Sequence, residues 1–271
     1  MTDASEPLQR YVLPSGSTGR ERLRLLAAAT EPGTMRLLGD IGVAAGMTCL
    51  DVGCGGGDAS RLLAQRVGTG GKVVGVDLDA ELVAIAAAEA EALGLRQLSF
   101  RAGSALELRE TGFDVVYARF LLTHLADREA AIAAMLGALR PGGTIVAEDI
   151  DFAGHFAYPD CPALLEFSRL YTALARTTGG DAEIGRAVPS LLRRAGAADV
   201  RVQISQPVAL AGAVKLVDAC TMQGIGARVV AAKLATAADV ERITTALERA
   251  AADPEVLISM PRIVQAWGKK P

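Results

Sequence analysis

The stretch TCLDVGCGGGD, residues 48–58, decides the fold of this chain. Its first five residues have the composition of a buried strand, and the glycines that follow allow a tight turn and a close approach of the backbone to a ligand. The next run, Asp58 to Val67, has the composition of a helix, and the free amide groups at its start would point back at that ligand. The stretch therefore predicts a strand, a turn and a helix that together bind a nucleotide-type molecule.

The spacing of the glycines separates two classes of ligand. A dinucleotide-binding turn needs its third glycine at the position of Asp58, whereas here it falls one residue earlier, at Gly57. The acidic Asp51 within the strand is unfavourable beside a pyrophosphate but suits an ammonium group. A ligand with an amino-acid end and a nucleoside end therefore fits better than a dinucleotide.

Further segments follow this turn in a fixed order. They are KVVGVD at 72–77, Gly103-Ser104-Ala105 after a strand at 98–101, FDVVY at 113–117, and Arg140-Pro141-Gly142-Gly143 before a strand at 144–148. With these segments the chain resembles the class I S-adenosylmethionine (SAM) dependent methyltransferases, closely over residues 35–150, and within them the small-molecule group with a type 11 or UbiE-like domain. The resemblance implies SAM as the cofactor and methyl transfer to an O, N or C atom of a small molecule, a class that includes secondary metabolites.

The resemblance also implies a set of cofactor contacts. Asp51 takes the position that holds the methionine end of SAM, Asp77 the position whose carboxylate accepts both ribose hydroxyls, and Leu78 the position that packs on the adenine. Ser104 stands where the family usually has an acid that binds the adenine amino group, and a serine accepts that bond more weakly. The expected contacts are Tyr11, Asp51, Gly53, Cys54, Gly55, Gly57, Asp77, Leu78, Ser104, Ala105 and Arg119.

Two members of this set lie outside the strand-end motifs. Tyr11 belongs to an N-terminal arm that often folds over the cofactor in the family, and the alternative is that it anchors a mobile arm. Arg119, just past the fourth strand, would hold an edge of the cofactor or an acidic substrate.

His124 and His155 are the candidate catalytic residues, because both follow strand ends on the expected active face. A base with a pKa near neutrality assists methyl transfer where the acceptor carries a proton. In the family a histidine at the position of His124 often packs near the cofactor without catalysing. The alternative for both residues is a hydrogen-bonded loop histidine.

A cluster of acids, Glu148, Asp149 and Asp151, closes the fifth strand. The alternation of a strand sends Asp149 and Asp151 to the same side, where they could bind a basic substrate group, a magnesium ion or the start of the next segment. The cysteines form no C-x-x-C pair and no metal spacing. The sequence therefore predicts no metal site.

Composition narrows the class of partner. The net charge of −3 argues against a protein that tracks a nucleic-acid backbone, and no apolar run reaches the roughly 18 residues of a membrane span. The polar N-terminus carries no secretion signal, and the unpaired cysteines fit a reducing compartment. We expect a cytoplasmic monomer or homodimer that acts on a small-molecule acceptor, without nucleic acid or membrane.

Strands and helices alternate over residues 47–150, which predicts an α/β fold with a Rossmann-like doubly wound, mostly parallel sheet and an antiparallel final strand over 258–267. Residues 1–46 would form a helical arm over the cofactor, with one helix at 20–30 and another at 35–41 capped by Thr34. Residues 151–271 would complete the sheet and carry helical cap insertions at about 153–180 and 208–253.

The sequence is compatible with three functions. The leading one is a SAM-dependent methyltransferase of small molecules. The alternative is a SAM-binding regulator or partner subunit without transferase activity, and an NAD-dependent dehydrogenase comes third.

Overall fold

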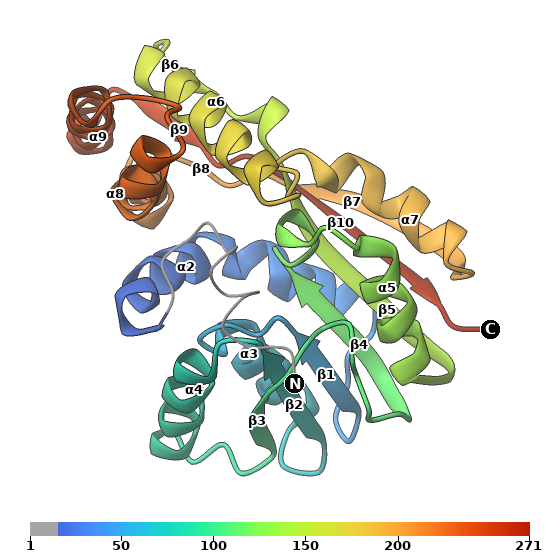
Figure 1. Ribbon diagram of the computed structural model, residues 1–271. Helices are drawn as coiled ribbons and strands as arrows, with labels where there is room; N and C mark the ends of the chain where they lie inside the picture. Colours follow the sequence, from blue (N-terminus) through green and yellow to red (C-terminus); the bar gives the residue numbers. More distant parts are fainter. Residues whose placement is uncertain (1–15) are drawn as a thin grey trace.

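The computed structural model describes residues 16–271, which form a seven-stranded sheet covered by helices on both faces (Figure 1). The strand order is β3-β2-β1-β4-β5-β10-β7; β10 is antiparallel to both of its neighbours, and the pairs from β3 to β5 are parallel. The strands are β1 Thr48–Val52, β2 Lys72–Asp77, β3 Leu98–Ala102, β4 Phe113–Arg119, β5 Leu139–Asp151, β7 Ala198–Ser205 and β10 Arg262–Lys269. The predicted fold class is confirmed.

The two faces of the sheet are set by the alternation of side chains along its strands. Leu50 and Val52 of β1 pack with residues of α5 and α7, whereas Cys49 packs with residues of α3 and of the C-terminal half of α2. The α-helices are α2 Gly16–Asp40, α3 Asp58–Val67, α4 Ala80–Ala92, α5 Arg128–Ala138, α6 Pro162–Thr177, α7 Val188–Arg194, α8 Ala213–Ala231 and α9 Ala237–Ala252.

Side chains cap several helix starts. Asp79 caps α4 by accepting from two amides of its first turn, and Asp127 caps α5 by accepting from the Ala130 amide. Thr236 and Asp239 form a capping box at the start of α9.

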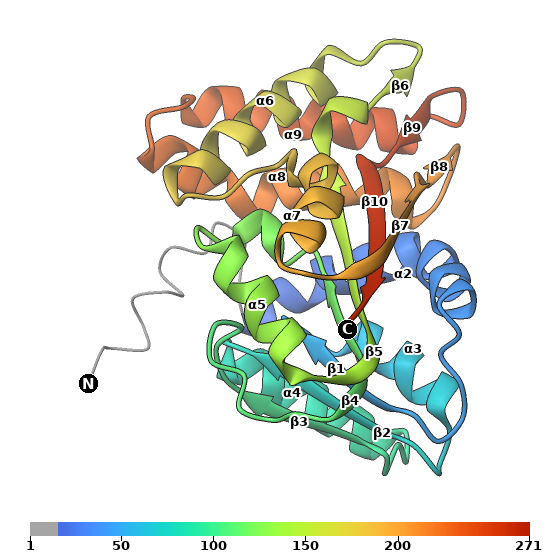
Figure 2. The ribbon, with the colours of Figure 1, turned by 90° about the vertical axis from the view of Figure 1, so that its right-hand side faces the viewer.

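Three helices gather at the carboxyl end of the sheet and form a second layer of structure. Figures 1 and 2 show α6, α8 and α9 above the strand ends, with α2 beneath α8. Their shared core includes Phe167, Met222 and Leu247, and a small sheet of β6 Ala157–Tyr158, β9 Leu257–Ser259 and β8 Val208–Ala209 flanks them. We call α6, α8 and α9 the cap helices.

One helix replaces the two that the sequence predicted before β1. α2 runs unbroken through Pro32, and Thr34 does not cap a new helix, so that prediction is wrong. The Thr34 hydroxyl instead donates to a buried carboxylate of β5, and a Cβ on Gly33 would lie 2.2 Å from the hydroxyl of Ser205. The hydrogen bond of Thr34 ties the turn after Pro32 to β5, a long-range contact that favours a continuous helix over the break that proline promotes.

The segment predicted as one final strand is two strands in different sheets. β9 ends at Ser259 and β10 begins at Arg262, so Pro261 lies between the two strands. Proline has no amide hydrogen for either ladder, which suits the crossing between sheets. Within residues 16–271, no helix is long and apolar enough to cross a membrane.

Candidate functional site

The glycine-rich turn after β1 is shaped by close contacts that only glycine tolerates. Gly53, Gly55 and Gly57 have φ values of +71°, +51° and +76°, in the region that other residues avoid. A Cβ on Gly53 would lie 2.8 Å from a methyl of Leu121, and one on Gly57 would lie 2.6 Å from the ring of Phe100. The turn therefore depends on glycine at both ends.

Hydrogen bonds fasten this turn to the end of β2. The amides of Gly53 and Cys54 donate to the carbonyl of Val76 at 2.8 and 3.0 Å. The Gly55 amide donates to Oδ2 of Asp77 at 2.8 Å, and Oδ1 of Asp77 accepts from the Asp79 amide. Burial raises the pKa of Asp77. The predicted carboxylate thus lies directly beside the turn.

Asp51 is buried within β1, and Oδ2 accepts from the hydroxyl of Ser60 at the start of α3, at 2.5 Å. Burial raises the pKa of Asp51 to about 6, and the Ser60 hydrogen bond and the charge of Arg119 oppose this rise. The charge of Asp77 raises this pKa further. Asp51, Asp77 and Arg119 lie near the carboxyl ends of the neighbouring strands β1, β2 and β4.

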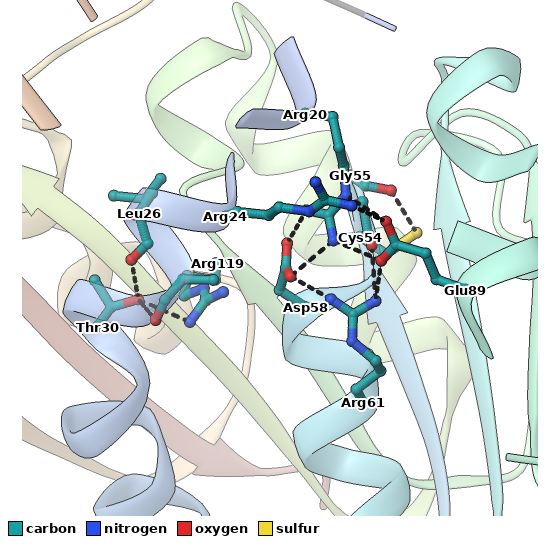
Figure 3. Close-up of polar contacts among 12 residues, drawn as sticks. Arg20, Arg24, Leu26, Thr30, Cys54, Gly55, Asp58, Arg61, Glu89 and Arg119 are labelled. Atoms are coloured by element: carbon teal, nitrogen blue, oxygen red, sulfur yellow. Dashed lines mark hydrogen bonds and ion pairs between the residues drawn. The ribbon is translucent and has the colours of Figure 1, made fainter. Parts of the chain in front are cut away.

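Arg119 links the end of β4 to α2. Its Nη1 donates to the hydroxyls of Thr30 and Thr34 at 3.0 and 3.1 Å, and Figure 3 shows it directed at Thr30. The guanidinium carbon lies 5.8 Å from the ring centroid of Phe120. Arg119 thereby holds α2 beside the strand ends.

The remaining predicted contacts have separate surroundings. Ser104 Oγ accepts from the Leu106 amide at 3.1 Å, and Ala105 packs against the core on the α5 face. Leu78 is half-buried directly after β2. Cys54 is buried, and burial raises the pKa of its thiol well above the ordinary value. Tyr11 lies outside the described residues.

Arg20, which is not among the predicted site residues, lies over the glycine turn. Arg20 of α2 forms ion pairs with Asp58 at the start of α3 and with Glu89 of α4, both at 2.7 Å, and Arg61 bridges the same two acids (Figure 3). A Cβ on Gly56 would lie 2.7 Å from Arg20 Nη1. Hydrogen bonds from Arg20 lower the pKa of Glu89 to about 2. No local sequence signal marks Arg20, because its partners are 38 and 69 residues away.

The acids at the end of β5 have separate partners. Asp149 accepts from the amides of Thr123 and Ile150, and burial raises its pKa to about 7. Asp151 forms ion pairs with Arg262 at 2.8 Å and Arg186 at 3.3 Å. Across residues 16–271, no group of three or more His, Cys, Asp or Glu side chains could hold a metal ion.

Comparison with known proteins places this arrangement in a family. The profile described as "Methyltransferase domain" matches residues 44–192, more than half of the chain. The chain belongs to the class I SAM-dependent methyltransferases. SAM is the cofactor of this family, and the glycine turn with a carboxylate beside it is chemically suited to a nucleoside that carries an amino acid.

Individual relatives support the same family. The chain is 40% identical over 106 residues to a demethylmenaquinone methyltransferase of Oceanobacillus iheyensis, covering 38% of this chain and 44% of the relative. It is 32% identical over 174 residues to an arsenite methyltransferase of Aquipseudomonas alcaligenes, covering 61% of this chain and 48% of the relative. The matched regions thus span about half the length of these curated relatives.

A solved structure shows the same fold. Phosphoethanolamine N-methyltransferase 2 of Haemonchus contortus, in complex with phosphomonomethylethanolamine and S-adenosylhomocysteine, aligns with a TM-score of 0.56 at 17% identity. The alignment covers 89% of this chain and 52% of that structure.

The two histidines of this methyltransferase lie in different surroundings. His124 ends the short helix η1 Leu122–His124 after β4, where burial and the charge of Arg22 lower its pKa to about 3. At neutral pH it is therefore uncharged and a weak base.

His155 lies among the cap helices. Its Nδ1 is 3.0 Å from the hydroxyl of Ser168 on α6, and its Nε2 is 3.2 Å from Oδ2 of Asp218 on α8, without the alignment of a hydrogen bond. Phe152 and Phe167 meet its ring edge-on. Both ring nitrogens thus face cap residues, while Asp51, Asp77 and Arg119 gather at the glycine turn.

Proposed function

We propose that this chain is an enzyme that transfers a methyl group from SAM to an O, N or C atom of a small-molecule acceptor. The observation that carries the proposal is the Asp77 carboxylate held against the Gly55 amide at 2.8 Å, at the carboxyl edge of the sheet. Ligands of doubly wound folds bind at this edge, where the strand order reverses between β1 and β4.

Each predicted contact has a role in this proposal. Asp77 binds the ribose hydroxyls, and Leu78 packs on the adenine beside Ser104 and Ala105. Asp51 holds the methionine end of the cofactor, and Arg119 anchors its edge from β4. The turn residues Gly53, Cys54, Gly55 and Gly57 bring the backbone close to the ligand. Tyr11, outside the described residues, stays a predicted contact of the cofactor.

The chain contributes position rather than covalent chemistry. When bound, SAM supplies an electrophilic methyl group on a positively charged sulfur. Arg20 and Arg119 fix α2 over the turn by ion pairs and hydrogen bonds, which excludes water and aligns the acceptor. His124 and His155 remain candidate bases from the sequence, and the pKa of His124 near 3 weakens its case at neutral pH.

The division of the chain follows from these roles. Residues 1–46 form an arm over the cofactor, residues 47–150 bind it, and the helices within 153–180 and 208–253 choose the acceptor. The two relatives are named for demethylmenaquinone and arsenite as their own acceptors, and the acceptor proposed for this chain is defined only as a small molecule that is methylated at O, N or C. Cytoplasmic location and a monomeric or homodimeric state remain predictions from the sequence.

The proposal is tested by methyl transfer from labelled SAM to a panel of small molecules, with the purified full chain and Asp77→Ala as the matched control. We expect wild-type turnover that exceeds that of the variant at sub-saturating SAM. If SAM binds but no panel member is methylated, a SAM-binding regulator becomes the better account. If SAM does not bind, the cofactor assignment itself is wrong.

A further inference from the structure

Arg22 of α2 is a largely buried charge that faces α8. Its side chain lies inside the protein with 9% of the residue exposed, and Nε donates to the hydroxyl of Thr221 on α8 at 3.0 Å. The Thr221 hydroxyl in turn donates to the Val217 carbonyl. Within residues 16–271, Arg22 has no carboxylate at ion-pair distance, whereas the nearby Arg20 has two.

The guanidinium of Arg22 faces the cap rather than the glycine turn. On another face of α2, Arg20 and Leu23 lie against Gly56 and Gly55. Arg22 instead meets α8, and α2 lies directly beneath α8 in Figure 1.

The charge of Arg22 acts on the pKa values of three side chains from three elements. Burial lowers the pKa of His124 after β4, and Arg22 lowers it further. Burial raises the pKa values of Tyr171 on α6, to about 12, and Cys220 on α8, and Arg22 opposes both rises. Its hydrogen bond to Thr221 places the guanidinium between α2 and α8, where α2 lies beneath the cap helices.

A guanidinium held largely out of water without a counter-ion is costly to the folded state. Its planar fork matches the two oxygens of a carboxylate or phosphate. We propose that Arg22 binds the anionic group of the methyl acceptor, so that the acceptor is a small carboxylate or phosphate. This inference rests on the proposed function and adds the substrate class to it.

The position of Arg22 favours the acceptor over the cofactor as the source of that anion. The methionine carboxylate of SAM would lie near the glycine turn, on the side of Arg20 and Arg119, while Arg22 is bonded to the cap. Thr221 accepts from Nε of Arg22, which leaves the two Nη nitrogens of the guanidinium to donate to an anion.

The test uses the full chain saturated with S-adenosylhomocysteine and three probes of similar size: benzoate, phenyl phosphate and the uncharged benzamide. Dissociation constants are measured by calorimetry for wild type, Arg22→Met, Arg22→Lys and Arg36→Met, where Arg36 is an exposed arginine of the same helix. Affinity for SAM is measured for each variant in parallel.

We expect benzoate or phenyl phosphate to bind wild type and Arg36→Met, and benzamide not to bind. Arg22→Met should weaken anion binding at least about tenfold, or about 1.4 kcal/mol, while the SAM dissociation constant stays within about twofold. Arg22→Lys should restore part of the affinity, because it keeps the charge without the fork.

The proposal is overturned if neither anion binds wild type, or if Arg22→Met binds them as wild type does. A tenfold loss of SAM affinity in Arg22→Met would also overturn it, by assigning Arg22 to the cofactor. If Arg22→Met does not fold, Arg22→Lys decides: it should bind phenyl phosphate at least about threefold more weakly, and unchanged affinity contradicts the proposal. Loss of SAM binding by wild type would instead refute the proposed function.

Discussion

The amide of Gly55 lies 2.8 Å from Oδ2 of Asp77, so a hydrogen bond joins the turn after β1 to the end of β2. The two residues are 22 positions apart in sequence. The carboxylate is thereby fixed before any ligand arrives, and the ligand does not have to order it.

Replacing Asp77 with alanine should weaken SAM binding by roughly 1.5 to 3 kcal/mol, the range for losing hydrogen bonds to a charged group. Calorimetry measures the change, and circular dichroism checks that the variant folds. Asp160→Ala, at an exposed position, is the control and should bind SAM as wild type does. Equal affinity in Asp77→Ala and wild type would remove Asp77 from the site.

Gly57→Ala should lower the free energy of unfolding by about 1 to 3 kcal/mol, because its φ is +76° and the new Cβ would lie 2.6 Å from the Phe100 ring. Gly137→Ala is the matched control within α5, where a Cβ meets nothing within 4 Å. It should raise the free energy of unfolding by up to about 1 kcal/mol. Denaturant titration measures both, and a neutral Gly57→Ala would contradict the described packing.

Arg20→Met should lower the free energy of unfolding by about 2 to 4 kcal/mol, because Asp58 and Glu89 would lose their buried partner and keep only Arg61 between them. Arg24 also pairs with Glu89, but its side chain is 57% exposed. Arg24→Met should therefore cost less than about 1 kcal/mol. Urea denaturation measures both variants. A similar loss of unfolding free energy in the two would contradict a special contribution of Arg20 to stability.

Asp149→Asn should change how stability depends on pH. Burial raises the pKa of Asp149 from 3.8 to about 7, so the folded chain holds a proton that the unfolded chain has lost within this window. This contribution to wild-type stability is present below about pH 4 and is lost as the pH rises to about 7.

The asparagine side chain does not titrate, so the variant does not lose this stability as the pH rises. The free energy of unfolding of the variant minus that of wild type should therefore increase by on the order of 4 kcal/mol between pH 4 and 7. Denaturant titrations at several pH values measure the difference. Asp160→Asn serves as the exposed control and should show no such trend. A pH-independent difference for Asp149→Asn would contradict the raised pKa.

The core of the fold could be predicted because its signals are local. The glycine turn, the caps Asp79 and Asp127 and the alternation of strands and helices all act within a few residues. The same holds for Asp77, which closes its own strand beside the turn.

The predictions from sequence were wrong or incomplete where contacts between distant residues override the local preference for a secondary structure. Pro32 predicts a helix break, but Thr34 and Gly33 contact β5 and β7 and keep α2 continuous. Arg20 and Arg22 carry no motif, and their partners lie up to 199 residues away. Such pairs can be identified only once the fold has brought the two residues together.

The central claim, that the turn from Gly53 to Gly57 binds SAM, is tested most directly by calorimetric titration of the full chain with SAM and with NAD. We expect one SAM site per chain, with a dissociation constant at least roughly 100-fold lower than that for NAD, or about 2.7 kcal/mol. Absence of SAM binding, or tighter binding of NAD, would contradict the account.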